Sequence, residues 1–456
     1  MPDILPLLLC LQPVLSKTQA RQLAHIVGAM LAMTGRITQL GISRWTDQGG
    51  SYRTIQRFFH TDMDWLLVQW AFFVRFAYDP TGVYVLAGDE TVISKSGKHT
   101  FGVDRFFSSL AARAIPSIAC FSIALLHVGK RQAYSLCNEQ VVRTDAEKEQ
   151  ARQRKQQQKQ RKQKKEPNKP RGRPVGSKNN NRAQGTLSPE LRRTQAQTRN
   201  VLARIGKKLS LSYLVLDGHF GHQGATLMAR QLDLHLISKL RSDSALYQEP
   251  TALQKPLRPR LKYGDRLDFA NLPKAWRRSE ETKDGYLTQV YQVRCLHKHF
   301  DRLLNVVILT RTHLASGRVG HVILFSSDLF LTAETVISYY TLRFQIEFTF
   351  RDAKQHFGLE DFMGVTKTSV ANGIGLPLFM GNLSAHLLEP LRLHSVEAGI
   401  VDLKSGYRGR FYASLVLKML PQRPEPILCE RLIEQIGRLG CIHASSQSAS
   451  DLKMAA

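Results

Sequence analysis

Four polar side chains recur at helical spacing in the segment ISYYTLRFQIEFTFRDAKQHFG. Tyr340, Glu347 and Lys354 are spaced by seven residues, and Arg343 lies three after the first and four before the second. On a helix these intervals place a phenol, a guanidinium, a carboxylate and an ammonium on one face. A carboxylate among cations on a largely apolar helix suits a site where a metal ion and a phosphate meet.

The residues around this group predict a single helix. Thr332 is a typical N-cap residue, and Gly358 stands where a helix would end. No Pro or Gly interrupts the residues between Tyr340 and Lys354, so we expect one helix of about six turns. A salt-bridged surface helix is the simpler alternative, because a lone Arg–Glu pair four residues apart is common on exposed helices.

Two further carboxylates follow apolar runs that predict buried strands. Asp89 falls at the end of the run in VYVLAGDETVISK, and Asp217 follows the run in SYLVLDGHFG. In open α/β sheets functional groups collect at the carboxyl ends of strands, and a buried carboxylate is costly unless it is paired or bound to a cation. Asp is also common in turns, and Glu90 competes with Asp89 for the same role. His219 and His222 have no further ligands at zinc spacing, so we interpret them as loop residues.

Asp89, Asp217 and Glu347 cannot be gathered in one place without a compensating charge. Mg²⁺ or Mn²⁺ supplies that charge, because hard cations take oxygen ligands. Two such ions about 3.5–4 Å apart activate water and stabilise the leaving oxygen at a phosphodiester. The three acids therefore indicate metal-assisted chemistry on phosphodiesters.

The overall charge points to a polyanionic partner. The chain has 456 residues, a net charge of +27 and an isoelectric point near 10.0. Nucleic acid is the first candidate partner and a membrane surface the second. The six Cys are scattered without a CxxC pair, which favours a reducing cytosol over a disulfide framework. The apolar start MPDILPLLLCLQPVL carries Asp3 and is short, so we expect neither a signal peptide nor a membrane span.

Residues from about 16 to 78 predict a helical domain. Ser16 can cap one helix, and Ser51 opens another, SYRTIQRFF, in which Arg53 and Arg57 share the exposed face. A Gly-containing turn before a basic helix is compatible with a helix-turn-helix module that contacts DNA. Most small helical bundles have the same pattern, so an ordinary bundle is the alternative.

Residues 147–182 have a different composition, with 14 Lys or Arg and 3 Glu. So little of this stretch can be buried that we expect disorder or a frayed helix. Within it, KPRGRPVGSK resembles an AT-hook, which implies that Arg171 and Arg173 follow the floor of a narrow minor groove. An inert, solvated linker is the alternative.

The β-rich runs over 245–330 are separated by Gly, Asp and Lys turns and lie between Asp217 and Glu347, so we expect an inserted β-domain there. Trp276 lies there in PKAWRRSE, beside two Arg. It is either a core or turn residue or an aromatic that stacks on an unpaired base. The strands expected over 115–129 and 131–143 begin the main sheet.

The complete spacing is more specific than any of its parts. Tyr340, two residues, Arg343, three residues, Glu347, six residues and Lys354 resembles the YREK group of DDE transposases from bacterial insertion sequences. The order strand-Asp, strand-Asp, helix-Glu resembles their RNase H-like catalytic domain. The resemblance covers roughly residues 16–400, with His in DGHF where Tyr is more usual.

This resemblance implies an α/β fold. An RNase H-like mixed-sheet core would carry an inserted β-domain and follow an N-terminal all-α DNA-binding domain. It also implies that the two Asp and Glu347 bind Mg²⁺ or Mn²⁺, and that Tyr340, Arg343 and Lys354 handle DNA near the cut. Family members with a β-insertion resemble hairpin-forming cut-and-paste enzymes, and a base-flipping role for Trp276 would follow from that likeness.

The sequence therefore predicts a transposase, an endonuclease that also joins strands. It would bind terminal inverted repeats in double-stranded DNA, cut each end and join the free 3′-hydroxyl to target DNA without ATP. We expect a dimer in the synaptic complex and a cytoplasmic, nucleoid-associated protein without a membrane. One alternative is an RNase H-like nuclease or resolvase without strand transfer. The other is a non-catalytic DNA-binding protein derived from a transposase.

The predicted organisation has seven parts, in which the core is interrupted twice. The chain begins with a helical DNA-binding domain (1–78), followed by the first part of the core (79–146) and the basic insertion (147–195). The second part of the core (196–244) precedes the β-insertion (245–330). The third part of the core, with the Glu helix (331–400), and a helical tail (401–456) complete the chain.

Overall fold

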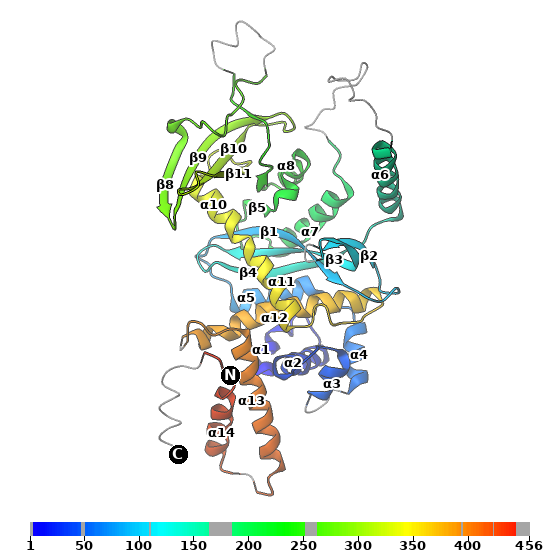
Figure 1. Cartoon of the computed structure of the whole chain (residues 1–456). Helices are drawn as coiled ribbons and strands as arrows, with labels where there is room; N and C mark the ends of the chain where they lie inside the picture. The colour runs from blue at the N-terminus through cyan, green and yellow to red at the C-terminus, as the bar shows by residue number, and fades with distance from the viewer. Residues whose placement is uncertain are drawn as a thin grey trace.

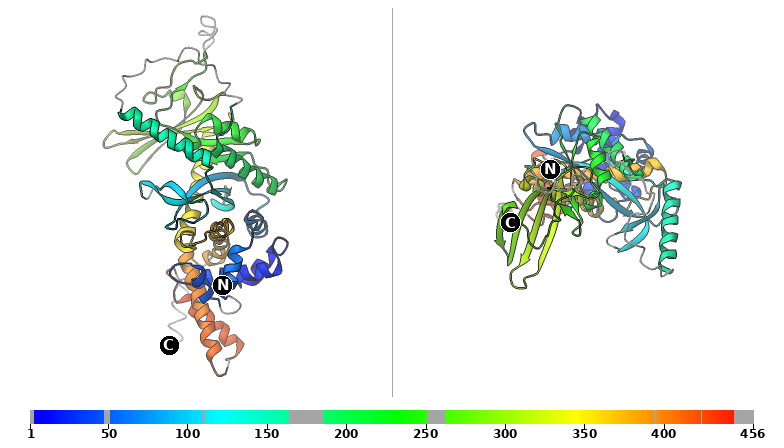
Figure 2. Two further views of the ribbon diagram at one scale, coloured as in Figure 1. Left: turned by 90° about the vertical axis from the view of Figure 1, so that its right-hand side faces the viewer. Right: turned by 90° about the horizontal axis from the view of Figure 1, so that it is seen from above.

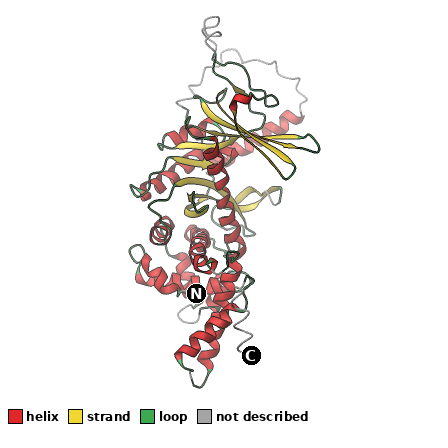
Figure 3. Cartoon of the chain, turned by 90° about the vertical axis from the view of Figure 1, so that its left-hand side faces the viewer, coloured by secondary structure: helices red, strands yellow, loops and turns green. Residues whose placement is uncertain are grey.

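The computed structural model describes residues 3–46, 51–108, 111–163, 185–250, 262–393, 395–422 and 424–443. Helices from the first and last parts of the chain gather at one end, and most strands lie towards the other (Figure 1 and Figure 3). The sequence-based expectation for Arg171 and Arg173 falls outside the described residues.

The N-terminal segment is helical, as predicted. Its elements are α1 (Ile4–Leu8), η1 (Leu9–Leu11), α2 (Lys17–Ala32), α3 (Gln39–Arg44), α4 (Tyr52–His60) and α5 (Trp65–Phe76). Ser16 and Ser51 accept hydrogen bonds from backbone N–H groups three residues on, and so begin α2 and α4 as N-caps. Ile55 on α4 is buried, while Arg53 and Arg57 are exposed, as their spacing predicted.

A large mixed sheet runs through the middle of the molecule. Within the described residues it is built from eleven strands: β1 (Tyr84–Ser94), β2 (Asp104–Ser108), β3 (Arg113–His127), β4 (Gln132–Val141), β5 (Tyr213–Leu216), β6 (His235–Leu240), β7 (Leu246–Tyr247), β8 (Arg277–Lys283), β9 (Tyr286–His297), β10 (Leu304–His313) and β11 (Val319–Ser326). Strands β1, β5 and β6 are parallel to one another, whereas β3, β4 and β11 run antiparallel to their neighbours. The fold is therefore mixed α/β, consistent with an RNase H-like core.

The strands from the β-rich segment extend this same sheet. Strand β11 pairs with β6 through Ile323↔Leu240 and Ser326↔Ile237, and β10, β9 and β8 follow in order. The β-runs expected over 245–330 are present, and they continue the main sheet instead of forming a sheet of their own. Strand β8 and helix α6 (Asp145–Gln163) lie on opposite sides of the molecule (Figure 1 and Figure 2).

Helices cover both faces of the central strands. One face packs on α5, α7 (Pro189–Ile205) and α8 (Gln223–Arg230), through residues such as Leu86 and Leu216. The other packs on α10 (Ala333–Leu342), α11 (Phe344–His356) and α12 (Lys367–Arg392). The strands are apolar on both sides because each face is buried.

The six-turn helix expected around Glu347 is two helices, which corrects the prediction. Thr332 caps α10 as expected, and Gly358, at φ +70°, follows the end of α11. The break falls at Arg343, between α10 and α11. Thr341 supplies a physical reason, since its hydroxyl donates to the carbonyl of Ile337 one turn earlier, a bond that bends helices.

The N-terminal helices share a core with the C-terminal ones. Helix α12 and α13 (Ile400–Met419) contribute Phe379 and Leu403 to the cluster that contains Phe58 and Trp65. Helix α14 (Pro426–Arg438) packs beside α13. In the part of the chain that the structure describes, no helix is long and apolar enough to cross a membrane.

Candidate active site

Asp89 and Asp217 follow the same step of the sheet. The parallel pairing of β1 with β5 ends at Gly88↔Leu216, and each Asp is the next residue along the chain. The sequence predicted Asp89 at the end of its strand, and this prediction is corrected, because β1 continues to Ser94 in its pairing with β3. A Cβ at Gly88 would lie 2.8 Å from the Leu216 side chain and 2.9 Å from the Phe121 ring, so a larger residue there would displace these side chains.

Asp217 begins a tight turn. Its Oδ1 accepts a hydrogen bond from the backbone N–H of His219 at 3.2 Å, which starts η3 (Gly218–Phe220). The hydroxyl of Ser238 donates to the Asp217 carbonyl at 2.6 Å and ties the turn to β6. A Cβ at Gly221 would lie 2.1 Å from the carbonyl oxygen of Lys239, so only glycine lets the turn approach β6 this closely. The turn that carries the Asp217 carboxylate is thus fixed from both sides.

Arg343 joins the third carboxylate to the first. One of its guanidinium nitrogens, Nη1, donates to Asp89, and the other, Nη2, donates to Glu347 at 3.1 Å. The side chain of Arg343 is 6% exposed, that of Asp89 17% and that of Glu347 45%. Glu347 therefore reaches solvent, while the contact of Arg343 with Asp89 lies inside. The break between α10 and α11 occurs at the residue that makes both contacts.

The charges of the group act on one another. Burial raises the pKa of Asp89 to about 6 although Arg343 opposes the shift, and the negative charges of Asp217 and Glu347 raise it further. Burial likewise raises the pKa of the Tyr340 phenol, which lies near the same four charges. The three carboxyl groups, the guanidinium and the phenol therefore share one electrostatic environment, although they come from β1, β5 and the two helices.

Lys354 contacts the same strand at a different point. Its Nζ donates to the carbonyl of Val92 on β1 at 2.7 Å and lies 3.5 Å from a Glu360 oxygen. Lys354 thus fastens α11 to β1 three residues beyond Asp89. Of the four residues expected on one helix face, Tyr340, Arg343 and Glu347 lie near Asp89 and Asp217. Lys354 instead holds α11 to β1.

A second polar group lies beside the first and was not recognised in the sequence. His219 Nε2 is 3.0 Å from Glu190 Oε1, and Glu190 stands in the first turn of α7. The pKa of Glu90 is raised by loss of solvation and by the charge of Glu190, and is lowered in turn by Arg143 and His219. The signal available in the sequence was the helix start Ser-Pro-Glu-Leu, which places an acid at an α7 N-terminus.

Other residues singled out from the sequence lie apart from this group. Arg53 and Arg57 are on α4, with α12 between them and the sheet (Figure 1). Trp276 ends η4 (Lys274–Trp276) before β8, half-buried against the main core. These three residues therefore do not touch Asp89, Asp217 or Glu347.

The three carboxylates suit a divalent metal ion by their chemistry, because all their donor atoms are hard oxygens. As the side chains stand, the described residues hold no group of three or more His, Cys, Asp or Glu placed to bind a metal ion. The guanidinium of Arg343 lies between two of the three acids and offsets part of their negative charge. Among the described residues the buried Nε of Arg343 has no hydrogen-bond partner. The hydrogen bonds that hold its guanidinium are therefore those from Nη1 to Asp89 and from Nη2 to Glu347.

A comparison with protein families is decisive for the class. The model of the DDE superfamily endonucleases matches residues 10–298. The matched range contains Asp89 and Asp217 and ends before the α10–α11 helices, so Glu347 lies outside it. No curated protein matches the sequence closely enough to count as a relative. DDE enzymes cut DNA with the help of divalent metal ions, and the mixed sheet with two adjacent carboxylates fits that class. The chain belongs to the DDE superfamily of endonucleases.

Proposed function

We propose that the protein is a transposase of a bacterial insertion sequence, of the group with the YREK spacing. It binds the terminal inverted repeats of its element, cuts the DNA at each end and joins the freed 3′-hydroxyl to target DNA. The protein acts as a dimer when it brings two ends together, because each end needs its own set of carboxylates. Its positive charge of +27 favours such a DNA-bound role.

One observation carries the proposal. Asp89 and Asp217 are adjacent where the parallel pairing of β1 and β5 ends, and Arg343 links Asp89 to Glu347. Three acids share one electrostatic environment with a single guanidinium among them, which favours a catalytic site over a protein that only binds DNA. Their mutual repulsion is a cost that a catalytic metal site explains.

Asp89, Asp217 and Glu347 are the residues that would hold Mg²⁺, or Mn²⁺ in its place. When bound, the metal supplies activation of water and stabilisation of the leaving oxygen at the scissile phosphodiester. The turn at Asp217 keeps that carboxylate oriented, since its Oδ1 is fixed by the N–H of His219. The exposed side of Glu347 gives the phosphate an approach from solvent.

The cationic and aromatic neighbours bind and orient DNA in this proposal. Tyr340 contacts the DNA strand at the cut, and Arg343, whose side chain is 6% exposed, does so by releasing Asp89 or Glu347. Lys354 keeps α11 against β1 so that the site stays in register. Arg53 and Arg57 on α4 contact duplex DNA away from the cut. The AT-hook-like Arg171 and Arg173 follow the minor groove of an A·T-rich flank.

Trp276 has a separate role in the proposal, as a residue that stacks on an unpaired base. Its place beside Arg277, before an exposed strand, is compatible with a contact to distorted DNA. A purely structural Trp276 would show itself if Trp276→Leu and Trp276→Phe lost stability in step with their loss of cleavage.

The deciding experiment is cleavage of DNA that carries the ends of the flanking element. Wild type and Glu347→Gln are compared in Mg²⁺ and in EDTA, with Glu334→Gln as the matched control, because Glu334 is an exposed acid in the first turn of α10. Metal-dependent cutting by wild type and by the control, and none by Glu347→Gln, supports the proposal. Binding by all three proteins without cutting by any would favour a DNA-binding protein that has lost catalysis.

The same reactions separate transposition from simple cleavage. A second DNA is added as a target, and joined products are sought among the cut ends. Cleavage with joined products is the result expected for a transposase. Cleavage without joined products under every metal condition would instead assign the chain to nucleases or resolvases that share the acids.

A further inference from the structure

Helix α6 (Asp145–Gln163) stands out because it has almost nothing to bury. Its sequence, DAEKEQARQRKQQQKQRKQ, contains no apolar residue except Ala146 and Ala151. From Glu149 onward, the described side chains of the helix are largely exposed. A helix that is polar all round is not held by a hydrophobic face, so its position must be set by its first turn or by a partner.

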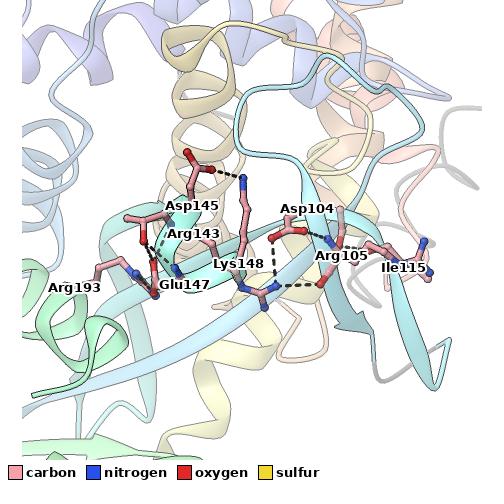
Figure 4. A network of polar contacts seen from close by, with 10 residues as sticks. Asp104, Arg105, Ile115, Arg143, Asp145, Glu147, Lys148 and Arg193 are labelled. Atoms are coloured by element: carbon pink, nitrogen blue, oxygen red, sulfur yellow. Dashed lines mark hydrogen bonds and ion pairs between the residues drawn. The ribbon is translucent and has the colours of Figure 1, made fainter. Parts of the chain in front are cut away.

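The first turn is anchored to the body of the protein by one carboxylate, that of Glu147. Its Oε2 accepts hydrogen bonds from the backbone N–H and the hydroxyl of Thr144, at 2.8 and 3.1 Å, which completes a capping box. Its Oε1 accepts a hydrogen bond from Arg193 of α7 at 2.7 Å. The side chain of Glu147 is 17% exposed, and these bonds lower its pKa although burial acts to raise it. Figure 4 shows the contact between Glu147 and Arg193.

A neighbouring contact fixes the chain just before the helix. Arg143 donates to Asp104 at 3.3 Å and to the carbonyl of Arg105 at 3.2 Å (Figure 4). Its guanidinium also lies over the ring of Phe106. The chain thus enters α6 from a position tied to β2. Together with the Arg193 contact, this sets the direction in which α6 leaves the sheet.

The base of α6 is connected through α7 to the turn that carries Asp217. Arg193 stands about one helical turn after Glu190, which contacts His219, two residues beyond Asp217. Arg143 acts on the charge of Glu90, the neighbour of Asp89. A ligand that lies along α6 would therefore run towards the edge where the parallel strands end.

The helix carries cations at a helical repeat. Positions 148, 152, 155, 159 and 162 are Lys or Arg, at intervals of four and three residues, the spacing of one side of a helix. The described members are weakly engaged, since Lys148 and Arg152 lie 3.7 and 3.8 Å from acids on their own helix. A row of Lys and Arg at this spacing is complementary to a row of phosphates.

We infer that α6 is a basic arm that lies along duplex DNA beside the catalytic edge, and that the contact of Glu147 with Arg193 sets its direction. This rests on the proposed function only in taking DNA as the substrate. Because Glu147 anchors the arm, this acidic residue inside a basic helix strengthens DNA binding instead of weakening it. From charge alone, removal of Glu147 would be expected to strengthen binding to DNA.

That reversal gives a matched pair of variants. Glu147→Ala and Glu149→Ala each remove one negative charge from α6, but Glu149 is exposed and its contacts are with residues of its own helix. Binding to a duplex with an element end is measured by fluorescence anisotropy in EDTA over a range of salt. We expect Glu147→Ala to bind about threefold to tenfold more weakly than Glu149→Ala, and its salt slope to fall by about 0.9 for each phosphate that the arm no longer reaches.

Two further variants separate the anchor from the cap. Glu147→Gln keeps the capping box and loses the ion pair with Arg193, so it should weaken binding less than Glu147→Ala. The double exchange Glu147→Arg with Arg193→Glu restores an ion pair, and it should bind better than either single exchange. The midpoint of thermal unfolding is measured for each variant. It should barely change, because α6 buries little, and an unchanged midpoint excludes a general loss of folding.

Footprinting tests the placement of the arm. The 19 residues of α6 span about 28 Å as a helix, close to the length of about eight base pairs. We expect hydroxyl-radical protection of the flank to shorten by about this length in Glu147→Ala and to stay unchanged in Glu149→Ala. Equal binding and equal footprints for the two variants would overturn the inference.

These results are distinguishable from failure of the proposed function. If wild type cuts DNA ends in Mg²⁺ and the Glu147 and Glu149 variants bind equally well, the inference about the arm is wrong and the proposed transposase function stands. Wild type that never cuts, with the expected difference between the variants, leaves a DNA-binding arm on a protein of another function. A larger change in binding to single-stranded RNA of equal length than to the duplex would contradict DNA as the ligand.

Discussion

The guanidinium of Arg343 contacts the carboxylate of Asp89, although 254 residues of sequence separate them. The contact joins the break between α10 and α11 to the middle of strand β1, and the second guanidinium nitrogen extends it to Glu347. A buried cation between two acids offsets the repulsion that would otherwise separate the strand from the helix. Arg343 therefore assembles the site as well as lying in it.

Removing Arg343 leaves two acids close together without their counter-charge. We expect Arg343→Gln to lower the free energy of unfolding by about 3 kcal/mol, as for a buried ion pair that loses one partner. Adding Ca²⁺ should restore more stability to this variant than to wild type, because the cation replaces the lost charge. Chemical denaturation in EDTA and in Ca²⁺ measures both effects.

The control for this prediction is Arg351→Gln on the same helix. Arg351 is exposed and pairs with its neighbour Asp352, so its loss should change stability by less than about 0.5 kcal/mol. A Ca²⁺ effect of equal size in wild type and both variants would show that Arg343 and the cation do not share a place.

Asp217→Asn separates catalysis from structure. The amide oxygen can still accept the hydrogen bond from the N–H of His219, so the turn should be kept. We expect DNA-end binding to match wild type and cleavage to fall about a thousandfold, equivalent to about 4 kcal/mol of transition-state stabilisation. Loss of binding together with cleavage would make Asp217 a structural residue.

Stability should depend on pH through Asp89. Its pKa is raised to about 6, so between that value and the ordinary carboxyl pKa of about 3.9 the folded chain holds a proton that the unfolded chain releases. The free energy of unfolding therefore falls as pH rises through this window. In EDTA, the stability of Asp89→Asn relative to wild type should increase from pH 4 to pH 7, by up to about 3 kcal/mol. A difference that does not vary with pH would contradict the buried position of this carboxyl.

A fourth prediction concerns the joint between the N-terminal helices and α12. The Nδ2 of Asn372 donates to the carbonyls of Phe59 and Thr61 at 3.0 and 2.8 Å, and its Oδ1 accepts from the indole of Trp65 at 2.8 Å. Asn372→Ala leaves these buried groups unpaired, and we expect a loss of about 2–3 kcal/mol. Urea denaturation measures it against Asn271→Ala, an exposed control.

Much of the local structure was accessible from the sequence, because it depends on nearby residues. Ser16, Ser51 and Thr332 begin helices where their side chains predicted N-caps, and the apolar runs before Asp89 and Asp217 are buried strands. Capping and side-chain periodicity act over a few residues, so they are visible without the fold. The spacing of Tyr340, Arg343, Glu347 and Lys354 likewise singled out the segment that meets Asp89.

Only the tertiary structure decided how these pieces meet. Asp89 lies inside β1 and not at its end, because pairing with β3 continues past the last pair with β5. The helix breaks at Arg343, whose partner Asp89 is remote in sequence, and the strands after 245 join the main sheet through β6 and β11. The contact of Glu147 with Arg193 is of the same kind. Strand register and ion pairs between distant segments are set by packing of the whole chain, so no local pattern specifies them.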